Sequence, residues 1–147
     1  MKTACIIEYP DLQSATDQLM PEVHKCVENT TRNVVLAARS LAPKRTGALR
    51  VGIVGSPWEE KSKRPNKVAR QVYFDEKMND VFVKIGKNGK RYYYPASQEY
   101  GFLKKRPGSR GKEKHPGVFF MRNARDVVSV RFAKDMENIV RKVAEDD

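Results

Sequence analysis

The chain has 147 residues, with 29 Lys or Arg residues against 18 Asp or Glu residues and a net charge of +11. This length predicts one domain over residues 1–147, which can bury roughly 68–70% of its unfolded surface without a disulfide or metal. No apolar run reaches the ~18–20 residues of a membrane span, and the N-terminus lacks a signal peptide's apolar stretch. Cys5 and Cys26 are far apart and have no metal-ligand spacing. We therefore expect a soluble, intracellularly made protein whose thiols stay reduced.

The positive charge is concentrated in the middle of the sequence. Residues 1–42 carry four basic and five acidic side chains, and residues 119–147 carry six of each. Residues 43–118 carry 19 basic and seven acidic side chains, a net +12. An acidic partner is expected for this middle segment, either nucleic acid or an acidic protein surface.

A long helix is predicted from Pro21 to Ala42. Proline is suited to the first turn of a helix, and Pro43 ends the helix because it biases the residue before it away from helical geometry. The apolar positions step by four and three residues, which favours packing on the protein's own sheet over an intermolecular coiled coil. These positions are Val23, Val27, Thr30, Val34, Ala37 and Leu41. Before the helix, Ala4–Ile7 is a candidate edge strand or arm.

Four strands are predicted after the helix. Residues 49–54 alternate in polarity and indicate the first, 68–74 the second, 81–85 the third and 91–94 the fourth. Lys87–Asn88–Gly89–Lys90 predicts a hairpin between the last two, because Asn-Gly accepts the positive φ angles of a type I′ turn. Residues 95–101 are predicted to be a connector, with one helical turn over Ala96–Tyr100. The result is a small antiparallel sheet of three to four strands.

Two basic segments are predicted to be mobile loops. Residues 56–66 contain prolines and mixed charge, and residues 102–117 are rich in Gly, Pro, Lys and Arg. Trp58 in the first loop is either a packing lid on the core or an anchor in a partner's pocket.

Apolar residues again recur at helical spacing from Phe119 to about Ala144, which predicts a second long helix. The order helix, sheet, helix predicts an α+β domain in which a long N-terminal helix and a long C-terminal helix pack against the small sheet, both on the same side.

No catalytic constellation is found in the sequence. His24 and His115 have no carboxylate or cysteine at metal-ligand spacing, which argues against a zinc site. Glu99 is expected to cap backbone N–H groups or to pair with an arginine rather than to act as a general base. We expect no enzymatic activity, no cofactor and no metal.

Nucleic-acid binding is the alternative function that the residues themselves suggest. Basic clusters at 61–70 and 104–114 flank Tyr92, Tyr93 and Tyr94, which would lie on one strand. Consecutive residues of a strand point to opposite faces, however, and no RNP-like motif is present. A small basic nucleic-acid-binding protein therefore ranks second.

Three separated segments together resemble the neck and tail-completion (head–tail joining) family of long-tailed bacteriophages, which includes the minor tail protein Z group of phage lambda. Ala42–Arg50 is similar to the family's Ala-Pro-x-x-Thr-Gly-x-Leu-Arg. Tyr94–Gly101 is similar to Tyr-Ala-x-x-x-Glu-(Phe/Tyr)-Gly, and Phe120–Ala124 to Pro-Phe-Met-Arg-Pro-Ala. The residues that carry these matches are Pro43, Thr46, Gly47, Leu49, Arg50, Tyr94, Glu99, Tyr100, Gly101, Phe120, Met121, Arg122 and Ala124.

The resemblance implies a structural virion protein of the phage neck, assembled as a homo-oligomeric ring around the DNA channel and made in the host cytoplasm. Its partners would be copies of itself and neighbouring neck, head-completion, tail-tube or tail-terminator proteins, with possible contact to channel DNA and none to a membrane. We expect the two basic segments to carry these contacts, because such loops can become ordered against a neighbour. The candidate interface residues are Trp58, Lys61, Lys63, Arg64, Lys104, Lys105, Arg106, Arg110, Lys112 and Lys114.

Overall fold

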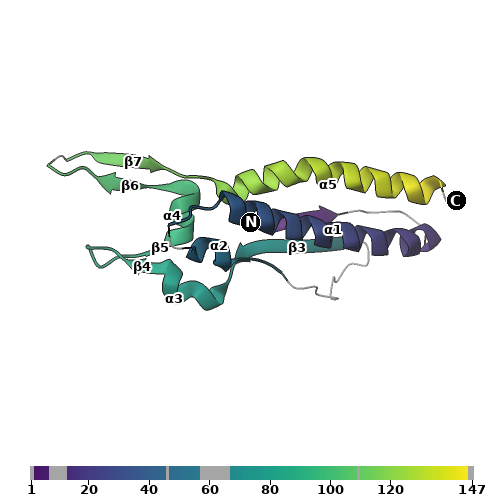
Figure 1. Cartoon of the computed structure of the whole chain (residues 1–147), viewed down its shortest axis with the longest axis horizontal. Coiled ribbons are helices and arrows are strands. Elements are labelled where there is room, and N and C mark those ends of the chain that lie inside the picture. The colour runs from purple at the N-terminus through teal and green to yellow at the C-terminus, as the bar shows by residue number, and fades with distance from the viewer. Residues whose placement is uncertain (1, 7–12, 46, 57–66, 109, 146–147) are drawn as a thin grey trace.

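Two long helices pack side by side and form the body of the molecule. The computed structural model describes residues 2–6, 13–45, 47–56, 67–108 and 110–145. Helix α1 (Gln13–Leu41) and helix α5 (Phe120–Glu145) run in opposite directions along the long axis (Figure 1). Both predicted helices are confirmed, and α1 begins eight residues before Pro21, which is accommodated inside it.

A three-stranded antiparallel sheet lies against α1. Strand β3 (Lys67–Phe74) is central and pairs with β1 (Lys2–Ile6) and with β2 (Ile53–Gly55). In the register, Ala4 is opposite Ala69 and Val54 is opposite Tyr73. The predicted α+β class is confirmed. Of the candidate edge strand or arm Ala4–Ile7, Ala4–Ile6 lies in the edge strand β1, and Ile7 lies outside the described residues.

The first predicted strand, 49–54, is mostly wrong. Residues Ala48–Gly52 form the short helix α2, and only Ile53 and Val54 of the predicted segment belong to a strand. Leu49 and Ile53 are buried while Val51 is exposed. Two buried residues four positions apart are compatible with one helical turn and also with the alternation of a strand. Over so short a segment the polarity pattern was therefore ambiguous.

The remaining strands form two separate hairpins instead of extending the sheet. After the turn η1 (Glu76–Met78) and the helix α3 (Asn79–Phe82), β4 (Val83–Ile85) pairs with β5 (Arg91–Tyr93). Helix α4 (Tyr94–Tyr100) follows, and then β6 (Gly101–Lys105) pairs with β7 (Lys112–Pro116). The predicted third strand therefore loses Val81 and Phe82 to α3, and the fourth loses Tyr94 to α4.

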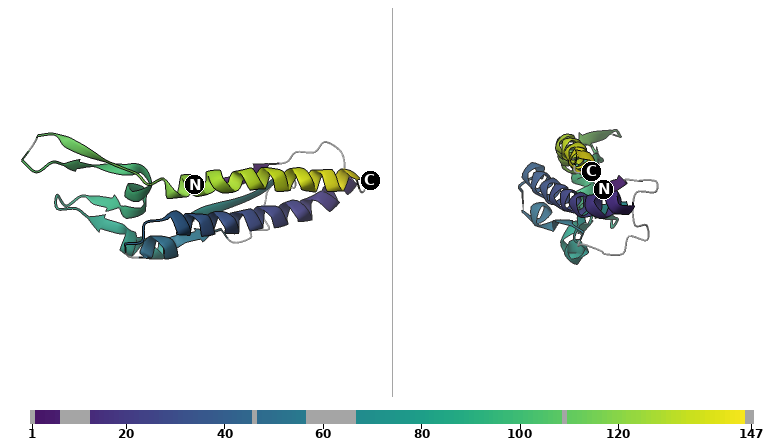
Figure 2. Two further views of the ribbon diagram at one scale, coloured as in Figure 1. Left: turned by 45° about the horizontal axis from the view of Figure 1, so that its top comes forward. Right: turned by 90° about the vertical axis from the view of Figure 1, so that its right-hand side faces the viewer.

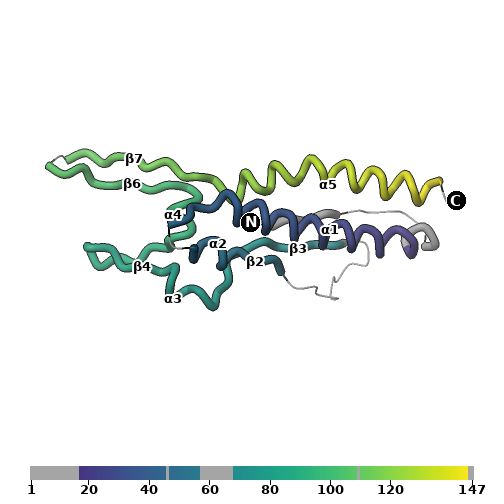
Figure 3. Tube along the Cα trace, viewed as in Figure 1, coloured from purple at the N-terminus to yellow at the C-terminus, as the bar shows by residue number. Residues whose placement is uncertain are grey.

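Both hairpins project from the same end of the elongated molecule. Figure 2 shows both hairpins extending away from the helix pair in a second view. In the Cα trace of Figure 3 they are two separate extensions beyond α4. Because β6–β7 is a paired hairpin, the prediction of a loop over 102–117 is wrong. The other predicted loop, 56–66, lies outside the described residues except for Ser56. No helix in the described parts of the chain is long and apolar enough to cross a membrane.

The core has two parts. One fills the seam between α1, β3 and α5, where Val23, Val27 and Val68 meet the partly buried Phe132 and Met136. The other lies where the hairpins join the body and includes Val34, Ala38, Ala42, Leu49, Ile53, Val72, Phe82, Phe120, Met121 and Ala124. The predicted stripe on α1 is buried except at its end, where Ala38 faces the core and Leu41 is 45% exposed.

Candidate interaction surface

The three segments that carry the family resemblance meet at one place in the fold. Ala42 and Leu49 from the first, and Phe120, Met121 and Ala124 from the third, lie in the same core cluster. Tyr94 from the second packs against that cluster. We call this meeting point the junction; it joins the helical body to the two hairpins.

Glu99 ties the second segment to the third. Glu99 is only 4% exposed, and its carboxylate accepts hydrogen bonds from the backbone N–H of Met121 (2.9 Å) and of Arg122 (3.0 Å). The first turn of a helix leaves such N–H groups without a partner within the helix. The negative charge of Glu99 also interacts favourably with the positive end of the α5 dipole. Of the two roles predicted for Glu99, capping backbone N–H groups and pairing with an arginine, the first is confirmed.

The connection from β7 to α5 crosses close to the end of α4. Val118 N–H donates to the carbonyl of Gln98 (2.8 Å), and Phe119 N–H donates to that of Glu99 (3.1 Å). A Cβ on Gly117 would overlap the Glu99 carbonyl oxygen, and one on Gly101 would overlap that of His115. Backbone contact this close fixes the root of the β6–β7 hairpin to the junction.

Two arginines hold the first segment in place. Arg50 donates to the carbonyls of Ala42 and Ser40, each at 3.4 Å, at the end of α1. Arg39 donates two bonds to the carbonyl of Ile53, at 2.8 and 3.0 Å. Gly47 takes a φ of 73° before α2. Orphan carbonyls at a helix end are commonly satisfied by basic side chains, so this segment has a structural role.

The other matched residues are on the rim of the junction. Pro43 is half-buried, Tyr100 is 69% exposed, and the Arg122 guanidinium lies 4.0 Å from the centre of the Phe119 ring. Phe119 has a φ of 52° immediately before α5, which directs the chain from β7 into the helix. Thr46 lies outside the described residues.

An aromatic cluster fixes the root of the β4–β5 hairpin. Phe74 contacts Phe82, Tyr93 and Phe120 edge to face, with ring centres 5.6, 6.4 and 6.0 Å apart. Burial raises the pKa of the Tyr93 phenol above its ordinary value. The neighbouring Tyr92 is 45% exposed, and Tyr94 lies on α4, so the three tyrosines do not lie on one strand.

The turn of this hairpin differs from the predicted type I′. Of the residues at the turn only Gly89 has a positive φ, 75°, and its N–H donates to the carbonyl of Gly86 (2.9 Å). A type I′ turn needs positive φ at both central residues, so the chain forms a three-residue loop, Lys87–Gly89, ending in a glycine.

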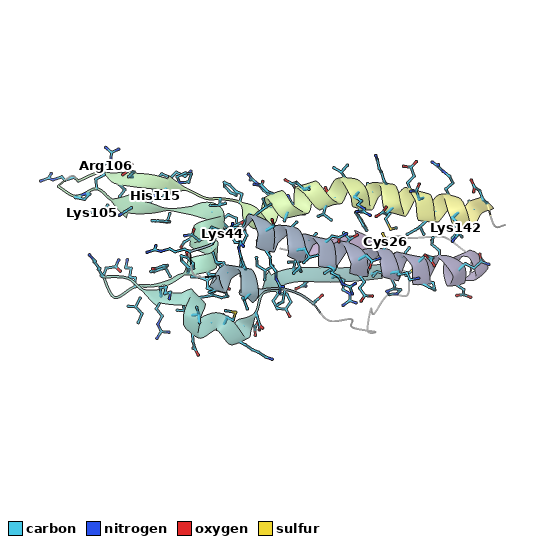
Figure 4. The ribbon with its side chains drawn as sticks, viewed as in Figure 1. Cys26, Lys44, Lys105, Arg106, His115 and Lys142 are labelled. Atoms are coloured by element: carbon cyan, nitrogen blue, oxygen red, sulfur yellow. The ribbon has the colours of Figure 1, made fainter. Side chains whose placement is uncertain are left out.

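The two hairpins carry most of the net charge of the protein. Residues 83–93 and 101–117 together contain ten Lys or Arg residues and one Glu, a net +9 of the total +11. The predicted interface residues on β6–β7 are all exposed, and Figure 4 shows Lys105 and Arg106 at the end opposite Lys142. They are Lys104, Lys105, Arg106, Arg110, Lys112 and Lys114. The predicted Trp58, Lys61, Lys63 and Arg64 lie outside the described residues.

The cations of the first hairpin were not among the predicted interface residues. Lys84, Lys87, Lys90 and Arg91 are exposed on β4–β5, with no acidic residue between them. Four like charges around an Asn-Gly turn were a signal that could have identified this hairpin as part of the surface. We call the two hairpins together the basic hairpin end.

The histidines are in different parts of the molecule. On α1, burial and the nearby Arg70 guanidinium lower the pKa of His24 below 6.5. On β7, His115 stacks on Phe102 with ring centres 4.9 Å apart. Within the described ranges, no three His, Cys, Asp or Glu side chains are placed to hold a metal ion together.

Comparison of the chain with protein-family models, with curated proteins and with solved structures finds no match.

Proposed function

We propose that this chain is a structural protein of a phage neck, which assembles as a homo-oligomeric ring and joins or completes the connection between head and tail. The observation that carries the proposal is the junction. Segments 42–50, 94–101 and 120–124 are far apart in the sequence, and each carries part of the family resemblance. Their residues share one core, and Glu99 bonds the second to the third.

The hairpins offer edges that a neighbouring subunit can use. Each consists of two strands, so every strand of β4–β5 and β6–β7 has one edge with no partner among the described residues. Such edges bind additional strands readily. A contact of this kind, repeated head to tail about an axis, closes a ring.

Exposed apolar side chains accompany these edges. Ile85 on β4 is 70% exposed and Leu103 on β6 is 63% exposed. On α5, Val127 and Val130 are 69% and 65% exposed. Burial of such residues between subunits would favour assembly.

The test combines the size of the assembly with its activity in joining. We expect the purified full-length chain to form rings visible by electron microscopy and to restore joining when added to heads and tails that lack it. Deleting residues 104–114 should abolish joining. The thermal melt of the body should change little, because none of the described side chains of that segment is buried. Normal joining by the deletion variant would contradict the proposal.

The alternative is a small basic nucleic-acid-binding protein, which the net +9 of the basic hairpin end favours. A protein that stays monomeric at all concentrations and binds DNA would support this alternative over the neck assignment.

A further inference from the structure

The register of β6–β7 divides the side chains of this hairpin between two unlike faces. Side chains of directly opposite residues in an antiparallel pair lie on the same face. Leu103 is opposite Lys114 and Lys105 is opposite Lys112, so these four share one face. We call Lys105, Lys112 and Lys114 the lysine face.

The other face has an acidic side chain as well as basic ones. It carries Lys104 opposite Glu113, and the Glu113 carboxylate lies 3.9 Å from Arg106 Nε. Nearer the root, Phe102 stacks on His115 on this same face. The one acidic side chain of the hairpin is thus placed away from the lysine face.

The lysine face is an unfavourable arrangement for the isolated hairpin. Like charges directly opposite across two strands are destabilising, and Lys105 and Lys112 form such a pair. Lys114 is two residues along the same strand, about 7 Å from Lys112 at the rise of an antiparallel strand. None of the three forms an ion pair within the described chain, and all are exposed. An anionic ligand would relieve this repulsion.

We propose that the lysine face binds the phosphates of duplex DNA. Lys is depleted in the buried centre of protein–protein interfaces, whereas Lys and Arg make the phosphate contacts that supply most non-specific DNA affinity. A two-stranded ribbon is also an element that the major groove admits. The proposal names a partner for the neck protein and in that respect rests on the proposed function, but DNA binding is measured on the purified chain alone.

The test compares two charge-matched double variants of the full-length protein. K105Q/K112Q removes two charges from the lysine face. K134Q/K142Q removes two exposed lysines from α5, and Figure 4 shows Lys142 at the far end of that helix. Each protein is titrated against a fluorescent duplex of about 30 base pairs at salt concentrations from about 50 to 200 mM. Its assembly size is measured in the same samples.

We expect K105Q/K112Q to weaken DNA binding at least about tenfold and to reduce the slope of log K against log salt by about 1.8, because each phosphate contact contributes about 0.9. K134Q/K142Q should leave the slope unchanged. Equal effects of both variants would overturn the proposal, since they would reflect net charge alone.

Three further results separate this inference from the neck assignment. If K105Q/K112Q loses binding to polyglutamate or to other copies of the chain while DNA binding persists, the face binds protein and the proposal is wrong. If the variant merely aggregates with unchanged DNA affinity, its lysines protect the strand edges, and the proposal is also wrong. If the wild-type protein binds DNA through this face but never forms rings, the inference stands and the neck assignment fails.

Discussion

The helical body and the basic hairpin end differ in almost every physical property. The body buries its apolar residues between α1, β3 and α5, and outside the two hairpins the chain has a net charge of only +2. The hairpins carry +9 and, from Val83 to Ile85 and from Phe102 to Lys105, consist entirely of exposed residues. Stability is therefore expected to depend on the body and the junction, and binding on the hairpins. Four pairs of matched substitutions test this division.

The largest difference is expected between two phenylalanines. Phe120 in the junction is fully buried, whereas Phe102 in the hairpin is 44% exposed. F120A should lower the free energy of unfolding by about 3–5 kcal/mol, the usual effect of removing a buried ring. F102A should lower it by about 1 kcal/mol or less, because it loses mainly the stacking on His115. Urea unfolding at one fixed protein concentration measures both, and equal losses would refute the division.

The second pair compares two glutamates. In E99Q the amide NH2 group would face a backbone N–H that now donates to a carboxylate oxygen, so one donor loses its acceptor. Bonds to a charged acceptor contribute about 1.5–3 kcal/mol, and we expect a loss in this range. E113Q removes the same charge from an exposed carboxylate of the hairpin, and surface pairs contribute about 0–1 kcal/mol. A loss in E99Q as small as that in E113Q would show that Glu99 does not cap α5.

The third pair compares two glycines with positive φ. Gly89 has a φ of 75° with open space around it, and Gly101 has a φ of 83° with the His115 carbonyl where a Cβ would lie. G89A should therefore show only the strain of an unfavourable backbone, about 1–2 kcal/mol. G101A should lower the free energy of unfolding by about 1–3 kcal/mol more than G89A does, because the backbone must move to make room for the added Cβ. Both free energies are measured by urea unfolding. If the two variants lose the same free energy of unfolding, the root of the β6–β7 hairpin is not as tightly packed as the structure indicates.

The difference between the buried body and the exposed hairpins also explains which parts of the fold could be predicted from the sequence. Helices α1 and α5 bury one stripe along many turns, so Val23, Val27 and Val34 recur at a spacing that identifies the element. For Glu99 the sequence favoured a structural carboxylate over a general base, but capping and pairing with an arginine stayed open until the structure showed the cap. These features depend on burial, which leaves a periodic pattern.

The hairpin β6–β7 left no such pattern. No residue of its two strands is fully buried, so neither Leu103 nor Lys105 indicates a strand, and the glycines and prolines suggested a loop over the whole segment. Only its turn has loop character, with Gly108 at a φ of 71°. The lysine face could not be predicted either, because it depends on which residues of β6 and β7 are opposite each other. That register requires the position of the turn.

The smallest effect is expected from the two histidines and depends on pH. Burial first, and the Arg70 guanidinium second, lower the pKa of His24 below 6.5. Below pH 6.5 the unfolded chain therefore binds more protons at His24 than the folded chain does. The stability contributed by this residue is present above about pH 6.5 and is lost as the pH falls toward the lower pKa of the folded state. H24Q should thus reduce the loss of stability between pH 7.5 and 5.5, measured by urea unfolding. H115Q, which alters the hairpin and keeps His24, should retain the pH dependence of the wild-type protein; if H24Q retains it as well, groups other than His24 cause it.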